Sequence, residues 1–169
     1  KVDCVAYGCT SGAIAAGYKT ILEKVNLAKP KTKVTTPITS AINAFEVLNV
    51  NKISIFTPYT SEINQSLINY FEGKNIEISD LSYFDIASDL DIGKIDPNYL
   101  FETLANLDLS KSEVLFISCT ALPVMSLIKD IEKKIGKIVL TSNQVLIWDT
   151  LRNINFKNKI LDFGELFNN

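Results

Sequence analysis

Short apolar segments rich in β-branched residues alternate with amphipathic segments along this chain, and this alternation is the strongest constraint on its fold. The apolar segments have the length and composition of buried strands and occupy residues 2–7, 33–35, 52–57, 76–86, 114–118 and 137–140. The amphipathic segments are long enough for helices and occupy residues 10–24, 38–48, 60–74, 97–107, 122–135 and 142–153. Strands that alternate with helices of this length predict right-handed β-α-β units and a mainly parallel sheet. We therefore expect an α/β fold, in which ligands bind beyond the carboxyl ends of the strands.

Residues at the ends of the expected helices support these boundaries. Asp96 can cap a helix that begins with Pro97, because aspartate accepts hydrogen bonds from the first N–H groups and proline needs no partner there. Gly136 can end the helix over residues 122–135, since glycine readily adopts the left-handed backbone that terminates helices. Ser142 is expected to cap the last long helix.

The chain contains no histidine, which removes many familiar catalytic sites. Ser-His-Asp and Cys-His sites and the common zinc sites that contain histidine are impossible within it. Its three cysteines are too few for a four-cysteine metal site, and their odd number and unpaired spacing indicate the free thiols of a cytosolic protein. Acid–base catalysis would therefore fall to Cys, Asp, Glu, Lys or Tyr.

The distribution of charge and hydropathy excludes several classes of partner. The chain has 17 basic and 19 acidic side chains without a dense Lys/Arg run, so nucleic-acid binding is not expected. No apolar run approaches the roughly 18 residues of a membrane helix. The first residues also lack the basic and apolar regions of a secretory signal. We expect a cytoplasmic protein that does not bind a membrane.

Two strand-to-helix turns resemble each other and carry two of the three cysteines. Each has an apolar strand, a small residue, then Cys-Thr, at Cys9-Thr10 and at Cys119-Thr120. A thiol at a helix N-terminus meets unpaired N–H groups, which can lower its pKa from about 8.5 to roughly 3.5–7.5. The same N–H groups and the threonine hydroxyls would form an anion site. We expect the two turns to face each other across one cleft, and we assign the third cysteine, Cys4, to the core of its strand.

Further motifs follow in order along the whole chain: Gly8-Cys9-Thr10-Ser11-Gly12, Thr36-Pro37, Thr57-Pro58-Tyr59, Ile92-Gly93-Lys94-Ile95-Asp96-Pro97, Ser118-Cys119-Thr120, and Ser142-Asn143-Gln144 with Trp148. Together they resemble the maleate cis–trans isomerase and arylmalonate decarboxylase branch of the aspartate/glutamate racemase superfamily. The resemblance implies two Rossmann-like lobes with parallel sheets related by pseudo-two-fold symmetry, no metal or organic cofactor, and a homodimer. On this basis the first lobe would comprise residues 1–35 and 141–169 and the second lobe residues 36–140.

The resemblance also implies roles for single residues. Cys9 matches the thiol that adds to the substrate double bond, and Cys119 matches the thiol that donates and removes a proton across the site. Tyr59 resembles the tyrosine that hydrogen-bonds the substrate carboxylate, and Asn143 is a weaker match to a site-forming position. The expected substrate-binding residues are Thr10, Ser11, Tyr59, Thr120 and Asn143.

Two departures from the family pattern bear on the site. Family members usually begin with two further β-α units, whereas this chain starts directly in the strand before Cys9. We therefore expect an incomplete first lobe, in a chain that is a fragment or is completed separately. Residues 88–91 read Ser-Asp-Leu-Asp where the family often has asparagine. A carboxylate from Asp89 or Asp91 that faced the site would repel a dianionic substrate.

Three functions are compatible with these residues. The thiol at Cys9 argues against decarboxylation, because the decarboxylases of this branch have a non-thiol residue at that turn. The resemblance favours an isomerase that acts on a small dicarboxylate, converting maleate to fumarate through a covalent adduct on Cys9. An amino-acid racemase of the aspartate or glutamate type, working by proton transfer between the two thiols, is an alternative. A catalytically inactive carboxylate-binding module is another.

Overall fold

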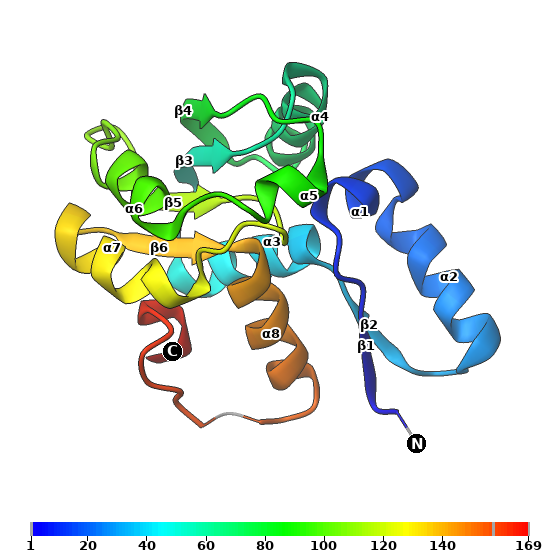
Figure 1. The fold of residues 1–169 in the computed structure, drawn as a ribbon. Helices are drawn as coiled ribbons and strands as arrows, with labels where there is room; N and C mark the ends of the chain where they lie inside the picture. The colour runs from blue at the N-terminus through cyan, green and yellow to red at the C-terminus, as the bar shows by residue number, and fades with distance from the viewer. Residues whose placement is uncertain (1, 157, 169) are drawn as a thin grey trace.

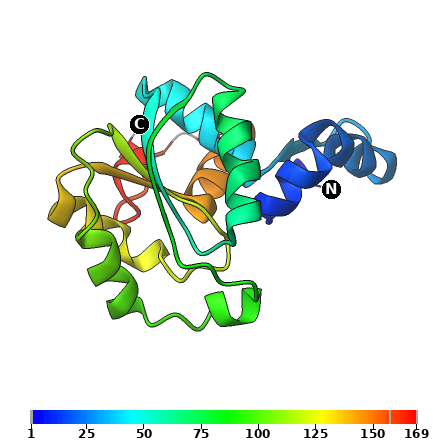
Figure 2. The ribbon, with the colours of Figure 1, turned by 90° about the horizontal axis from the view of Figure 1, so that it is seen from above.

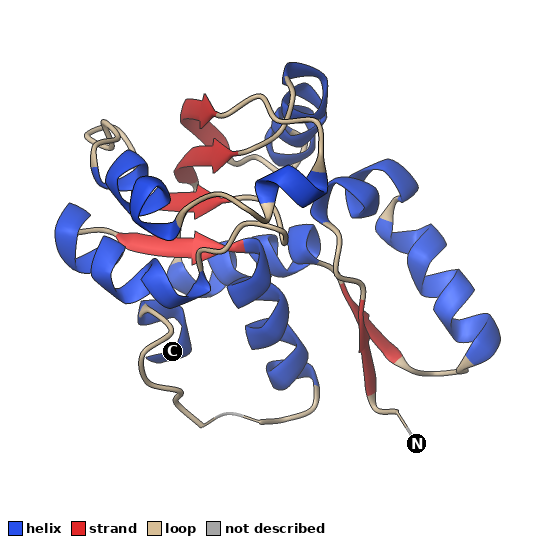
Figure 3. Ribbon diagram, in the orientation of Figure 1, coloured by secondary structure: helices blue, strands red, loops and turns tan. Residues whose placement is uncertain are grey.

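The computed structural model describes residues 2–156 and 158–168 of the chain and contains parallel strands alternating with helices (Figures 1 and 3). The strands are β1 (Cys4–Ala6), β2 (Lys33–Thr35), β3 (Lys52–Thr57), β4 (Glu77–Tyr83), β5 (Val114–Ile117) and β6 (Ile138–Thr141). The α-helices are α1 (Thr10–Ala16), α2 (Tyr18–Ala28), α3 (Pro37–Leu48), α4 (Ser61–Glu72), α5 (Asp89–Ile92), α6 (Pro97–Ala105), α7 (Ile128–Ile135) and α8 (Ser142–Asn153). Two 3-10 helices, η1 (Met125–Leu127) and η2 (Glu165–Asn168), complete the described elements.

The strands form two parallel sheets, which confirms the expected α/β class. The larger sheet has the order β4-β3-β5-β6, and the smaller one pairs β1 with β2. From β3 the chain crosses to β4 on one side and then returns to β5 on the other side of β3. The carboxyl ends of β3 and β5 therefore flank a topological switch point, where open α/β sheets bind ligands.

Helices cover both faces of the four-stranded sheet, with α3 and α4 on one face and α6 and α7 on the other (Figure 2). The first face is filled by an aromatic cluster in which the ring of Phe116 meets Phe45 and Phe71 edge-on, with centroids 5.8 and 5.5 Å apart. The second face buries Leu100 and Ile131 against β5 and β6. The near-continuous burial of β5 explains its uninterrupted apolar sequence.

The two-stranded sheet projects with α1 and α2 from the side of the larger sheet (Figure 2). Helix α8 packs against both β1 and β2, and Ala13, Ile21 and Val34 join the same apolar cluster as the first face of the larger sheet. The segment is therefore connected to the larger sheet by a shared core. Its assignment, with residues 141–169, to a separate lobe stays a prediction.

Two expected helices differ from the structure. The helix expected over residues 10–24 is divided into α1 and α2 by Gly17, whose φ of 76° lies in the left-handed region. The helix expected over residues 122–135 begins only at Ile128, after a turn and η1. Leu122 precedes Pro123, and the residue before a proline is disfavoured in the helical region. Helix α5 was not expected from the sequence.

Two of the three expected helix ends are confirmed. The Asp96 carboxylate accepts the N–H groups of residues 98 and 99 ahead of Pro97, and Gly136 ends α7 with a φ of 67°. The cap of α8 is Thr141 instead of Ser142, because the Thr141 hydroxyl accepts the Gln144 N–H within a capping box. Ser142 is thereby available for another interaction. Among the described residues, none of the helices is both long and apolar enough to cross a membrane.

Replacement of Phe116 by alanine should destabilise the protein strongly, because the side chain is fully buried between two other rings. We expect a loss of about 3–5 kcal/mol in the free energy of unfolding, measured by urea denaturation. Leu27→Ala is the control, since Leu27 is 85% exposed on α2 and should change stability by less than about 0.5 kcal/mol. Equal effects of the two substitutions would contradict this description of the core.

Candidate active site

The first cysteine turn lies between β1 and α1. Cys9 is the N-cap of α1, and its Sγ accepts the N–H of Gly12 at 3.3 Å. The Ser11 hydroxyl lies 3.7 Å from the same sulfur. A Cβ on residue 12 would lie 3.0 Å from this Sγ and 2.8 Å from the Tyr7 hydroxyl, so a larger residue there would displace both groups slightly. The thiol is half-buried and hydrogen-bonded at the end of a helix.

The second cysteine turn follows β5 and has a different backbone. Cys119 has a φ of 122°, which side chains with a Cβ rarely adopt. It is 5% exposed, and its Sγ accepts the Ala121 N–H at 3.4 Å. Burial raises the pKa of the Cys119 thiol, and the negative charge of Asp89 adds to the rise, while the Ala121 N–H and the Tyr59 hydroxyl oppose it. The thiol is therefore held in its protonated form at neutral pH.

Tyr59 lies in the turn that follows β3, with 4% of its surface exposed. Buried Asn64 holds this turn, because its side-chain amide donates to the Tyr59 carbonyl at 3.1 Å and its carbonyl accepts the Thr57 hydroxyl at 2.6 Å. Burial, together with the nearby Cys119 sulfur, raises the pKa of the Tyr59 hydroxyl well above its usual range. Tyr59 can therefore act as a hydrogen-bond donor throughout the physiological pH range.

Both thiols and Tyr59 line one cavity of about 220 Å³ at the carboxyl ends of β3 and β5. Its lining residues are Gly8, Cys9, Thr10, Ser11, Tyr59, Asp89, Cys119, Thr120 and Ala121. The strand order brings the second thiol and the tyrosine together, because β3 and β5 are neighbours in the sheet. The first thiol reaches the cavity from the adjoining two-stranded sheet.

A hydrogen-bond network joins the two cysteine turns. The buried Ser142 hydroxyl oxygen accepts both the Thr10 hydroxyl at 2.9 Å and the Cys119 N–H at 3.1 Å. The Thr120 hydroxyl donates to the Gly8 carbonyl at 2.9 Å. These contacts link segments separated by more than one hundred positions and fix the two turns relative to each other.

The structure brings six of the seven proposed site residues to this cavity: Cys9, Thr10, Ser11, Tyr59, Cys119 and Thr120. Asn143 is not among the lining residues, and its amide donates to the Thr120 carbonyl at 2.9 Å. Thr10 and Thr120 use their hydroxyl protons in the network that joins the turns. These two side chains therefore position the turns and present only their oxygen lone pairs to a ligand.

Three expectations about the cysteines need correction. Cys119 does not lie at a helix N-terminus, since a turn and η1 separate it from α7. Its pKa is raised and not lowered, because burial outweighs the N–H groups that face the sulfur. Cys4 is half-buried on β1 and belongs to neither apolar cluster, so it is not a core residue.

Sequence reasoning missed the functions of Ser142 and Asn64 at this site. The sequence pattern around Ser142 is typical of a helix cap and gives no indication that its hydroxyl contacts both cysteine turns. Asn64 lies within an amphipathic helix and had no signal beyond being a polar residue on the buried face. Of the two carboxylates in question, Asp89 lines the cavity, whereas Asp91 pairs with Lys94 at 3.1 Å on the surface.

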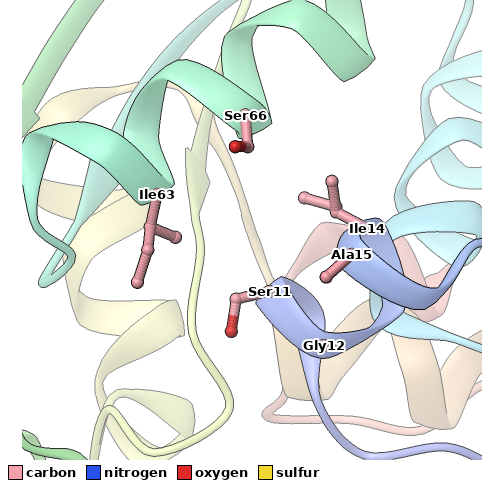
Figure 4. A pocket seen from close by; sticks show the side chains of 6 residues that line it. All are labelled: Ser11, Gly12, Ile14, Ala15, Ile63 and Ser66. Carbon is pink, nitrogen blue, oxygen red and sulfur yellow. The ribbon is translucent and has the colours of Figure 1, made fainter.

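A second cavity of about 480 Å³ adjoins the first through Ser11 (Figure 4). Helices α1 and α4 form its walls, and it is lined by Ser11, Gly12, Ile14, Ala15, Ile63 and Ser66. The side chains of Ser11 and Ile63 point into the space between the two helices (Figure 4). Among the described residues, no charged side chain lines this second cavity. In the described part of the chain, no group of three or more Cys, Asp or Glu side chains is arranged to hold a metal ion.

Comparison with known proteins places this geometry in a family. The sequence profile of the arylmalonate decarboxylase family matches residues 14–167. A maleate isomerase of Geobacillus stearothermophilus is 25% identical over 174 residues, covering 98% of this chain and 69% of the relative. A maleate isomerase of Alcaligenes faecalis is 21% identical with the same coverage. These matches confirm the resemblance seen in the motifs.

Solved structures share the fold of this chain. The maleate isomerase of Pseudomonas putida S16 superimposes with a TM-score of 0.91 at 19% identity, covering 98% of this chain and 70% of that one. A cysteine-to-serine mutant of the maleate cis–trans isomerase of Nocardia farcinica, which carries a covalently bound succinylcysteine intermediate, superimposes with a TM-score of 0.90 at 18% identity, covering 98% and 71%. At these identities the likeness establishes a common fold.

Replacement of Ser142 by alanine should destabilise the site, because it leaves the buried Thr10 hydroxyl and Cys119 N–H without an acceptor. We expect a loss of about 1–3 kcal/mol in the free energy of unfolding, measured by urea denaturation. Ser126→Ala, at an exposed position of η1, is the matched control and should be near neutral. A neutral Ser142→Ala would show that the network does not hold the turns together.

Proposed function

We propose that this chain, which belongs to the arylmalonate decarboxylase family, is a cofactor-independent cis–trans isomerase of a small dicarboxylate, maleate in the simplest case. The observation that carries the proposal is that Cys9 and Cys119 line one cavity of about 220 Å³, together with Tyr59. The names of the related maleate isomerases support the reaction, and the thiol at Cys9 supports covalent catalysis.

Each thiol is suited to one role in the addition step. The Cys9 thiolate attacks one alkene carbon and forms a C–S bond, while the displaced π electrons move onto the neighbouring carbon and its carboxylate. Cys119 then gives its proton to that carbon, which its raised pKa permits because the thiol stays protonated at neutral pH. Tyr59 donates its O–H to a substrate carboxylate and stabilises the charge that develops there. The product of this step is a saturated succinyl adduct on Cys9.

Rotation and elimination complete the reaction. The former double bond is now a single bond, about which the adduct rotates to place its carboxylates on opposite sides. The Cys119 thiolate removes the proton it gave, the C–C double bond forms again, and the C–S bond breaks to release fumarate and the Cys9 thiolate. Both thiols return to their starting states, so the reaction needs no external oxidant, reductant or cofactor.

Substitution of either cavity thiol should abolish or strongly slow the isomerisation of maleate, followed as fumarate by proton NMR. Cys9→Ala removes the nucleophile, and we expect no turnover above background. Cys119→Ser exchanges the acid for a much weaker one, and we expect kcat to fall by about 10²–10⁴-fold. The serine variant should also accumulate an adduct on Cys9 equal in mass to one molecule of maleic acid, detected by intact-protein mass spectrometry.

Cys4→Ser is the matched control, since this third thiol lies on β1 outside the cavity and its substitution should preserve turnover. Full activity in either cavity variant would exclude the two-thiol mechanism. If the wild type leaves maleate unchanged but exchanges the Cα proton of aspartate or glutamate for deuterium in D₂O, the protein is a racemase. Decarboxylation of an arylmalonate by the wild type would likewise contradict the proposal.

The pH dependence of kcat/KM should have a falling alkaline limb set by Cys119. The acid must be protonated, and burial raises its pKa, so activity should persist above the ordinary thiol value of about 8.5 and fall only at higher pH. Tyr59→Phe should lower kcat/KM and move this limb to still higher pH, because the Tyr59 hydroxyl bond lowers the pKa of Cys119. A limb below pH 8 or an unmoved limb in Tyr59→Phe would contradict the assignment of the acid.

A further inference from the structure

Asp89 carries the one carboxylate among the residues that line the two-thiol cavity. Asp89 is the first residue of α5, and it lines the cavity while remaining exposed to solvent. Within the described residues, no hydrogen bond or salt bridge neutralises its carboxylate. Its negative charge makes the smallest of the contributions to the pKa of the Cys119 thiol, after burial and the hydrogen bonds to the sulfur. A bound substrate therefore lies beside a solvent-exposed carboxylate that no cation pairs with among the described residues.

Among the described residues, the surroundings supply no cation to balance that charge. The other lining residues of the cavity include no lysine or arginine, and neither do those of the adjoining cavity between α1 and α4. The lysine nearest along the chain, Lys94, pairs with Asp91 at 3.1 Å. In the described part of the chain, a substrate with two carboxylates would thus meet the carboxylate of Asp89 and no cationic side chain at the cavity wall.

We propose that Asp89 selects the charge of the substrate, so that the cavity takes the half-amide of a cis-butenedioate in preference to the dicarboxylate. The proposal rests on the proposed function, namely addition and elimination at a cis double bond between the two thiols. The single carboxylate of the half-amide accepts the Tyr59 hydroxyl proton. Its amide NH₂ donates to the Asp89 carboxylate, which accepts hydrogen bonds and has no donor of its own when ionised.

The half-amide meets the chemical requirements of the same reaction. Its double bond is conjugated to a carboxylate and to an amide carbonyl, so Cys9 can add to it and Cys119 can protonate the neighbouring carbon as before. Elimination returns both thiols and releases the trans half-amide. No bond to the amide nitrogen is broken, so the amide serves recognition and takes no part in bond making. Specificity here comes from a repulsive element against the dianion as well as an attractive one for the amide.

The first test compares maleate with maleamate as substrates by proton NMR. In the wild type, kcat/KM should favour maleamate by about tenfold, the order of one like-charge contact in a half-open cavity. Asp89→Asn keeps the shape of the side chain and offers a donor, so the preference should vanish or reverse through faster turnover of maleate. Asp91→Asn is the matched control, because Asp91 lies two residues away, outside the cavity, and should leave the ratio unchanged.

A binding measurement separates this inference from the proposed function. Succinate and succinamate lack the double bond and cannot react, and their Kd values can be measured by calorimetry with the wild type and with Asp89→Asn. In one outcome, the wild type binds succinamate more tightly than succinate, Asp89→Asn loses this difference, and the wild type turns over neither maleate nor maleamate. That combination would support charge selection and refute isomerisation. The opposite outcome is that the wild type and Asp89→Asn both turn over the alkenes, with the same ratio of kcat/KM for maleamate to maleate and the same ratio of Kd for succinamate to succinate. That result would overturn charge selection and leave isomerisation intact. Asp89→Ser serves as a second variant should Asp89→Asn unfold, as judged by circular dichroism.

Discussion

The buried hydroxyl of Ser142 is the contact on which the geometry of the site depends. Its oxygen accepts one hydrogen bond from the first cysteine turn, through Thr10, and one from the second, through the Cys119 N–H. The two turns follow strands of different sheets. Two sulfurs can act on one small molecule only if their separation is held constant, and the shared acceptor at the start of α8 holds it together with the bond from Thr120 to the Gly8 carbonyl.

The strand order supplies the rest of the arrangement. In an open parallel sheet, the chain leaves adjacent strands in opposite directions at one position, and the loops there separate to form a crevice. Here that position lies between β3 and β5, so Tyr59 and Cys119 end up beside each other although they lie 60 residues apart in sequence. The segment between β4 and α6, which includes α5, contributes Asp89 to the same crevice. A tyrosine donor, a protonated thiol and a carboxylate thus meet because of topology.

Much of this arrangement could be predicted from the sequence because buried parallel strands and helix ends leave local marks. The apolar run of β5, the Asp96-Pro97 start and the Gly136 end are examples, and so are the two Cys-Thr turns. Contacts between distant segments leave no such mark. Ser142 and Thr141 are equally good caps in sequence, and only the fold shows that Thr141 caps α8 while Ser142 bridges the turns. The protonated state of Cys119 likewise depends on burial, which no local pattern reports.

The backbone of Cys119 has a consequence for how such a chain can change over time. A residue with a Cβ at a φ of 122° carries strain of about 1–3 kcal/mol, which glycine at the same position would relieve. The conformation is thus maintained against the intrinsic preference of the residue that occupies it. Selection for stability alone would favour glycine at this position, whereas the reaction proposed above would favour the thiol. In a lineage that no longer needed the reaction, this position would be among the first to drift, and its drift to glycine would make the protein more robust as it became inert.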